Sequence, residues 1–361
     1  MGYNGRKDPD LKERYVMSGM IFDYVTWGLL GAAVLLLLIR FVVRRVLAAA
    51  PKGGVSKQLY VDINGTKQWI SIYGKKKDNP VLLYLHGGPG ASTSTYDYVF
   101  TRKWADIYTV VTWDQRNCGK SWSPEQFDTA LTHDMMMEDG LDMLLYLRQT
   151  LGVEKVTILG HSWGSYFGAN LALEYPQFVE RYIGVGQLVD FLENEQTLKE
   201  EAALWVGEER EGQALLEKLS PEDRAAGHFQ ARNKLLKKYR YDMFAGGRDY
   251  IPIIVKFFNP YYSIRDYRRY AHSASRVYRD FVCSEEFDEF SLKERHTYQV
   301  PYYNINGDRD YQCNFKLAQA YFDQVEAPEK KLLLMKDMTH GLMEARTKEF
   351  SDLLHQLTAN S

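Results

Sequence analysis

The segment Val156-Thr157-Ile158-Leu159-Gly160-His161-Ser162-Trp163-Gly164 decides the predicted fold of this chain. Its first four residues form a short apolar run of the kind that is buried on both faces of a parallel sheet. Small residues then permit a sharp turn, and residues 163–174 have helical spacing. A strand, a tight turn that carries a serine and a helix together predict a nucleophile elbow, with Ser162 as the nucleophile.

Seven further segments have strand signals, five of them as short apolar runs, and four segments have helical spacing. The strand-like runs are residues 58–63, 67–73, 81–85, 108–113, 182–185, 300–305 and 332–335. The helical segments are residues 134–150, 163–174, 315–325 and 346–357. Asn64-Gly65, between the first two runs, is typical of a type I′ hairpin, so an antiparallel pair opens the domain. The later alternation predicts an α/β fold with a mostly parallel, doubly wound sheet.

This alternation stops over residues 189–298, which are rich in charged and aromatic residues and contain no convincing strand. We interpret this stretch as a helical cap inserted over the sheet. The predicted organisation is an N-terminal flank at 1–23, a transmembrane helix at 24–43, a linker at 44–56, a core at 57–188 and 299–361, and the cap at 189–298.

The predicted transmembrane helix has Arg40 as its only charge, and about 20 apolar residues are enough to span a bilayer. Tyr24 and Trp27 lie at one end, where interfacial aromatic residues belong. A buried core helix is disfavoured because the segment is apolar around its whole circumference. A cleaved signal peptide is the other alternative, since Ala48-Ala49-Ala50 resembles a cleavage site, but arginines separate these alanines from the apolar segment. We therefore expect an uncleaved, single-pass membrane anchor.

The orientation of this anchor is only weakly indicated. Basic residues flank both ends of the helix and favour a cytoplasmic C-terminal domain by a single charge. The cysteines Cys118, Cys283 and Cys313 favour the same side, because a reducing compartment tolerates free thiols best.

Composition and charge indicate the class of protein and the partners that are not expected. The chain has 361 residues, of which 45% are hydrophobic and 25% charged, as in a globular protein. Its net charge is −2, and its longest basic run is Lys75-Lys76-Lys77, so nucleic acid is not predicted as a partner. The three cysteines have neither disulfide nor zinc spacing, so we expect no metal and no cofactor.

A nucleophilic serine needs a histidine base and a carboxylate that orients the histidine. We assign the base to His340, which follows the run 332–335 and lies in the chain order expected after Ser162. The remaining histidines after Ser162 lie in the cap or the last helix, where a structural role is expected: His228, His272, His296 and His355. The run 300–305 leads into two candidate acids, Asp308 and Asp310, and both could serve.

The tetrahedral intermediate also needs hydrogen-bond donors for its oxyanion, usually two backbone N–H groups. One is expected from Trp163, the residue after the nucleophile. The other is expected from the loop His86-Gly87-Gly88-Pro89-Gly90 after the run 81–85. We choose Gly88, with Gly87 as the second choice.

Four motifs together resemble the proline iminopeptidase family of α/β-hydrolases. They are His86-Gly87-Gly88-Pro89-Gly90, Asp114-Gln115-Arg116-Asn117-Cys118-Gly119-Lys120-Ser121, Gly160-His161-Ser162-Trp163-Gly164-Ser165 and Gly307-x-x-Asp310-x-x-Cys313. The resemblance covers residues 57–186 and 299–358 and implies the α/β-hydrolase fold. It implies a metal-free serine peptidase that releases N-terminal residues, often proline, from peptides. Its catalytic residues would be Ser162, Asp310 and His340, which favours Asp310 over Asp308.

The chain departs from the family at His161 and Asn117, where glycine is usual, and at Asn314, where proline is usual. Family members bind the free α-amine of the substrate through acids in the cap. Glu193 and Glu195 are the candidates for this role here.

The elbow motif also occurs in esterases and lactonases, so a carboxylesterase, lactonase or small-amide hydrolase is the first alternative. The second alternative is a non-catalytic binding module on a hydrolase fold. That alternative requires a lost triad residue, and Ser162, Asp310 and His340 are all present.

Overall fold

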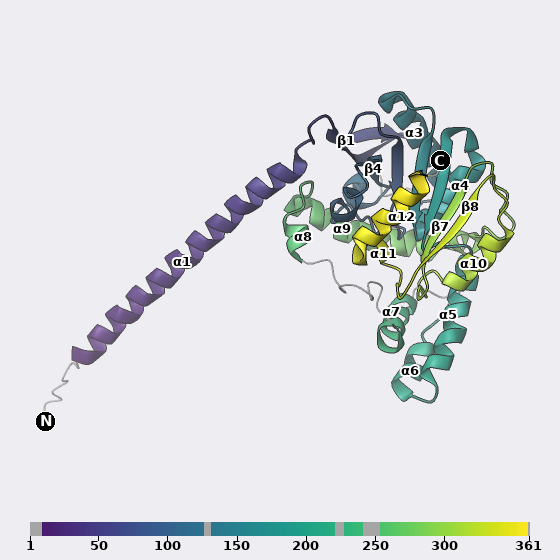
Figure 1. Cartoon of the computed structure of the whole chain (residues 1–361). Helices are drawn as coiled ribbons and strands as arrows, with labels where there is room; N and C mark the ends of the chain where they lie inside the picture. Colours follow the sequence, from purple (N-terminus) through teal and green to yellow (C-terminus); the bar gives the residue numbers. More distant parts are fainter. Residues whose placement is uncertain (1–8, 126–130, 221–226, 241–252, 360–361) are drawn as a thin grey trace. The chain divides into compact units, whose positions relative to one another are not determined.

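The computed structural model describes residues 9–125, 131–220, 227–240 and 253–359 (Figure 1). The chain divides into two compact units, residues 1–49 and 50–361. The first unit is the N-terminal helix, and the second contains the sheet, its covering helices and the inserted helices.

The N-terminal helix α1 (Pro9–Ala48) is continuous, and Met20–Ala48 is a candidate membrane span with a mean hydropathy of 2.2. The side chains in the most apolar window of this span are exposed, so α1 is not a buried core helix. The helix continues five residues beyond the predicted end at residue 43. The reason is local: residues 44–48 contain no helix breaker, and the first proline after them is Pro51.

The described residues form one eight-stranded sheet in the order β1-β2-β4-β3-β5-β6-β7-β8. The strands are β1 (Val55–Ile63), β2 (Thr66–Gly74), β3 (Val81–Leu85), β4 (Thr109–Asp114), β5 (Val156–His161), β6 (Val179–Val185), β7 (Tyr302–Gly307) and β8 (Lys330–Met335). The β1–β2 and β2–β4 pairs are antiparallel, and the other five pairs are parallel. Asn64 and Gly65 have φ values of 43° and 72°, the positive values that a type I′ turn requires. The predicted mostly parallel α/β sheet is confirmed.

Helices cover both faces of this sheet. Those outside the insertion are α2 (Tyr98–Thr101), α3 (His133–Leu151), α4 (Trp163–Glu174), α10 (Phe315–Gln324), α11 (Leu342–Ala345) and α12 (Thr347–Ala359). Along β3, Leu83 packs in a core with residues of α3 and α4, whereas Leu82 packs in a second core with residues of α2 and α12. This alternation explains why β3 is apolar at every position and why all five of its residues are buried.

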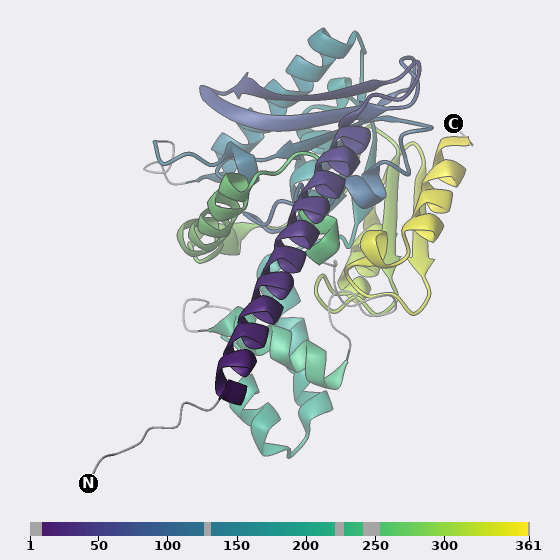
Figure 2. The ribbon, with the colours of Figure 1, turned by 90° about the vertical axis from the view of Figure 1, so that its left-hand side faces the viewer.

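The insertion between β6 and β7 is helical. Its helices are α5 (Phe191–Val206), α6 (Arg210–Leu216), α7 (His228–Tyr239), α8 (Ile253–Phe257) and α9 (Ile264–Val277), and α9 continues into a π-helical turn over residues 278–282. Helices α5, α6 and α7 lie together at the lower end of both views (Figures 1 and 2). They share a small core of their own, formed by Ala202, Val206, Leu216, Leu219, Ala231 and Leu235.

Candidate active site

Ser162 lies between β5 and α4 with φ 56° and ψ −122°, a backbone conformation that residues other than glycine rarely adopt. Two glycines make this turn possible. A Cβ atom on Gly160 would lie 2.0 Å from the carbonyl oxygen of Gly164, and one on Gly164 would lie 2.2 Å from that of Leu85. The turn therefore presses against β3, and the strained backbone at Ser162 has the geometry of a nucleophile elbow.

Asp310 and His340 form a buried pair on the loops that follow β7 and β8. Asp310 Oδ2 accepts a hydrogen bond from His340 Nδ1 at 2.8 Å, and both side chains are almost completely buried. The other carboxylate oxygen, Oδ1, accepts the backbone N–H groups of Gln312 at 2.9 Å and Cys313 at 3.0 Å. Asp308 instead accepts the N–H of Met338 at 3.3 Å. Of the two candidate acids, the structure places Asp310 against His340.

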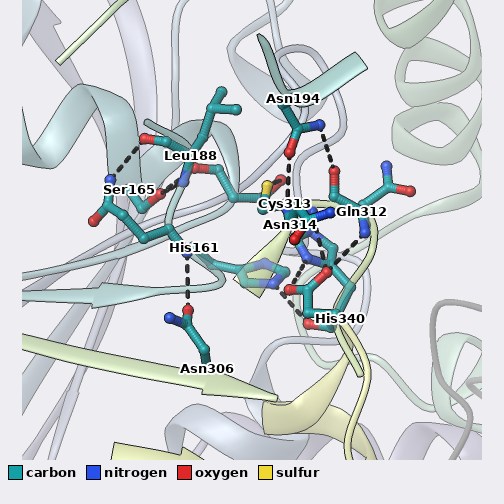
Figure 3. A network of polar contacts seen from close by, with 12 residues as sticks. His161, Ser165, Leu188, Asn194, Asn306, Gln312, Cys313, Asn314 and His340 are labelled. Carbon is teal, nitrogen blue, oxygen red and sulfur yellow. Dashed lines mark hydrogen bonds and ion pairs between the residues drawn. The ribbon is translucent and has the colours of Figure 1, made fainter. Parts of the chain in front are cut away.

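His340 packs against the residue that precedes Ser162. The rings of His161 and His340 lie 4.6 Å apart between centroids, and His161 Nε2 donates to the carbonyl oxygen of His340 at 3.0 Å (Figure 3). Burial and the neighbouring His340 lower the pKa of His161 to about 3. His161 is therefore neutral at physiological pH, and the carbonyl contact requires its proton to be on Nε2.

The predicted oxyanion donors lie around the same serine. Gly88 and Trp163 line one cavity together with Ser162, and Trp163 is the first residue of α4. Gly87 is also close, since a Cβ atom there would lie 3.0 Å from Cβ of Ser162. The helix N-terminus at Trp163 favours negative charge at this position.

The cavity has a volume of about 250 Å³ and two chemically different walls. Its apolar wall contains Leu188, Phe191, Phe229, Tyr278, Val282 and Phe287. Its polar corner contains Asn194, Glu195, Arg232 and Gln312. Cys313 also lines the cavity, with Sγ 3.8 Å from Ser162 Oγ, and burial raises the pKa of this thiol far above its usual value.

The two predicted amine-binding acids have different environments. Glu195 is buried in the polar corner, where its Oε2 lies 2.7 Å from His228 Nε2 and 3.0 Å from Arg232 Nε. Burial alone would raise the pKa of Glu195, but the Arg232 charge and the His228 hydrogen bond outweigh burial and lower it. Glu193 faces outward, 42% exposed, and pairs with Lys293 at 2.9 Å. The structure brings Glu195, but not Glu193, to the cavity.

Sequence reasoning missed the partners of Glu195. His228 and Arg232 are four residues apart and therefore share one face of α7, a spacing visible in the sequence. Nothing in the sequence pairs that face with α5. Asn194 was also missed, although it lies between the two chosen acids.

Among residues 9–125, 131–220, 227–240 and 253–359, no group of three or more His, Cys, Asp or Glu side chains could hold a metal ion.

Three comparisons place this geometry among known proteins. Residues 80–253 match the family model described as alpha/beta hydrolase fold. The probable aminopeptidase YbaC of Bacillus subtilis is 24% identical over 286 residues, which cover 78% of this chain and 89% of that protein. The proline iminopeptidase of Saccharolobus solfataricus is 35% identical over 127 residues, which cover 34% of this chain and 38% of that protein.

Solved structures give the same result for the fold. The proline iminopeptidase-related protein of Thermus thermophilus superimposes with a TM-score of 0.55 at 20% identity, covering 84% of this chain and 98% of that one. A membrane phospholipase A described as a bacterial virulence factor gives a TM-score of 0.58 at 20% identity, covering 96% and 98%.

The chain therefore has the α/β-hydrolase fold, and it is a hydrolase. Within that class, the resemblance to proline iminopeptidases predicted from the four motifs is confirmed by the named relatives.

Proposed function

We propose that this hydrolase cleaves an acyl bond through a covalent intermediate on Ser162, with His340 as the base and Asp310 as the residue that orients His340. The observation that carries the proposal is the strained serine between β5 and α4, whose neighbour His161 packs against the buried Asp310–His340 pair. In the first step Ser162 Oγ attacks the substrate carbonyl carbon while His340 takes the hydroxyl proton. The oxyanion is held by the N–H groups of Gly88 and Trp163.

The second half of the reaction uses the same residues. His340 returns its proton to the leaving amine or alcohol, and the acyl group stays on Ser162 as an ester. A water molecule then loses a proton to His340 and attacks this ester, which releases the acid and regenerates the hydroxyl. Asp310 stays ionised throughout and stabilises the imidazolium.

The substrate class that we propose first is a peptide with a free N-terminus, as for an aminopeptidase of the proline iminopeptidase type. Support comes from the names of the relatives and from Glu195, a buried carboxylate in the same cavity as Ser162. A cavity of about 250 Å³ with an aromatic wall has room for one small apolar residue such as proline. Glu195, rather than the partly exposed Glu193, would then bind the substrate amine.

A second candidate, the hydrolysis of esters, lactones or small amides without a free amine, is favoured by a different observation. Arg232 and His228 already contact the Glu195 carboxylate, so its negative charge is compensated inside the protein. A cationic amine would have to approach a carboxylate that already has a guanidinium beside it, which weakens the attraction. An uncharged acyl group meets no such competition.

The two candidates are separated by matched substrates. We would measure kcat and KM of the full-length protein in detergent with prolyl and alanyl amides, their N-acetyl forms and short-chain esters, using Ser162→Ala as the inactive control. An aminopeptidase should cleave only the free-amine amides. Glu195→Gln should then raise KM for those substrates at least tenfold, and Glu193→Gln should not. Rapid ester cleavage with equal treatment of free and blocked amines would refute the peptidase and support the second candidate.

We also propose that Met20–Ala48 is an uncleaved, single-pass anchor, with the catalytic unit on the cytoplasmic side. Support comes from the length and hydropathy of this helix and from the arginines that follow its apolar segment. Intact mass and carbonate extraction of the membrane fraction test this. A mature chain that begins after Ala50 would refute the anchor, and protease accessibility of the catalytic unit from outside intact cells would refute the orientation.

A further inference from the structure

We propose that the inserted helices form part of the catalytic machinery, because Asn194 of α5 and Arg232 of α7 hold the loop that carries Asp310 in its working position. The inference rests on the proposed roles of Ser162, Asp310 and His340. It goes beyond them by assigning Asn194 and Arg232 as positioning residues, which act on catalysis through the backbone of residues 310–314.

Asn194 makes the first part of this connection. Its Nδ2 donates to the carbonyl oxygen of Gln312 at 3.0 Å, and its Oδ1 accepts the backbone N–H of Asn314 at 2.8 Å (Figure 3). One buried amide therefore satisfies both a carbonyl and an N–H of the loop on either side of Cys313. Such a pair of bonds fixes the orientation of the loop as well as its distance from α5.

Arg232 makes the second part. Its guanidinium donates to the same Gln312 carbonyl oxygen and also pairs with Glu195 through Nε at 3.0 Å. Glu195 in turn accepts from Nδ2 of Asn194 at 3.1 Å. Side chains of α5 and α7 are thus bound to each other as well as to the loop. Asn194, Glu195 and Arg232 are each at most 3% exposed.

The loop passes this restraint directly to the acid. The N–H groups of Gln312 and Cys313 donate to Asp310 Oδ1, and Asp310 Oδ2 accepts from His340. Gln312 therefore makes both connections. Its carbonyl oxygen accepts hydrogen bonds from α5 and α7, and its N–H donates to the carboxylate of Asp310. If the helices release Gln312, the carboxylate loses a fixed donor, and His340 loses its fixed partner.

The test is the variant Asn194→Ala in the full-length protein, compared with Gln196→Ala as the control. Gln196 lies on the same helix and also loses a side-chain hydrogen bond, the 2.8 Å contact with Glu200, but it is exposed and contacts no part of the loop. Three quantities are measured: the rate at which a fluorophosphonate labels Ser162, kcat per labelled site, and KM. The substrates are a free-amine amide, its N-acetyl form and an ester.

Because a misplacement of about 1 Å can cost about 100-fold, we expect Asn194→Ala to lower kcat and the labelling rate about 10- to 100-fold. The loss should be similar for every substrate that the wild type cleaves, with KM nearly unchanged, and Gln196→Ala should behave like the wild type. A role in amine binding would change free-amine substrates alone. A merely structural role would lower the number of labelled sites and leave the rate per site intact. Either result would overturn the inference.

Arg232→Lys provides a second variant if Asn194→Ala does not accumulate as folded protein. Lysine keeps the positive charge beside Glu195 but lacks the fork that reaches Gln312 at the same time, so the labelling rate should again fall. Wild-type labelling rates in Arg232→Lys would refute the inference. Turnover that persists in Ser162→Ala would instead refute the proposed function, so the two failures are distinguishable.

Discussion

Gly186 offers a sharp test of where the catalytic pair lies, because this residue follows β6 and contacts both members of the pair. It has a φ of +53°, and a Cβ atom added to it would lie 3.0 Å from His340 Nδ1 and 3.1 Å from Asp310 Oδ2. Comfortable contacts between non-bonded heavy atoms are about 3.5–4.0 Å, so at least one of the two groups must move by several tenths of an ångström. The 2.8 Å hydrogen bond between them would then be stretched or misaligned.

Two effects of Gly186→Ala can be separated. The left-handed φ costs about 1–2 kcal/mol of stability for a residue with a Cβ atom. The displacement of the pair should lower kcat about 10- to 100-fold, since about 1 Å of misplacement can cost about 100-fold. Gly152→Ala is the matched control, because Gly152 ends α3 with a φ of +68° and has nothing within 4 Å of the added atom.

The assay is kcat per fluorophosphonate-labelled site, together with the melting temperature of each variant. Both variants should melt a few degrees lower than the wild type, by about 2 °C for each kcal/mol lost. Only Gly186→Ala should lose activity per site. Equal activity of the two variants would show that His340 and Asp310 are not the groups that limit the reaction.

The remaining predictions concern ionisable groups away from the cavity. Burial and the nearby Asp114 raise the pKa of Asp97 to about 7, so the folded state binds a proton that the unfolded state loses near pH 4. Stability should therefore fall as the pH rises from about 4 to about 7, and Asp97→Asn should flatten this part of the curve in urea titrations; a parallel curve would contradict the assignment. Arg116 pairs with the buried Asp139 at 2.7 Å, so Arg116→Met should cost about 3–5 kcal/mol of unfolding free energy. Lys67→Met, which breaks the exposed pair with Asp62, should cost at most about 1 kcal/mol, and similar losses in both would refute the reasoning.

The elements around Ser162 could be predicted because their signals are local. A short apolar run, a glycine-flanked serine and a helical pattern occupy one continuous segment, and burial on both faces makes such runs apolar throughout. All eight predicted strands occur. As predicted, Asp310 follows the first strand after the insertion and His340 follows the second. Helix α1 extends beyond both ends of the predicted membrane span at 24–43, because helix formation does not require apolar residues.

The polar corner could not be predicted in the same way, because its contacts join residues far apart in the sequence. Glu195 meets His228 from 33 positions away, and Asn194 meets the loop at Gln312 and Asn314 from about 120 positions away. Helical geometry does separate Glu193 from Glu195, since residues two apart point to nearly opposite sides of a helix. Only the packing of α5 shows which of the two faces the cavity.

The most direct test of the central claim is the site of covalent modification. The full-length protein would be treated with a fluorophosphonate and digested, and the modified peptide would be sequenced by mass spectrometry, with Ser162→Ala and the neighbouring Ser165→Ala treated in parallel. We predict one stoichiometric adduct on Ser162, absent from Ser162→Ala, with all turnover lost in that variant. An adduct on another residue, or turnover that persists in Ser162→Ala, would contradict the account.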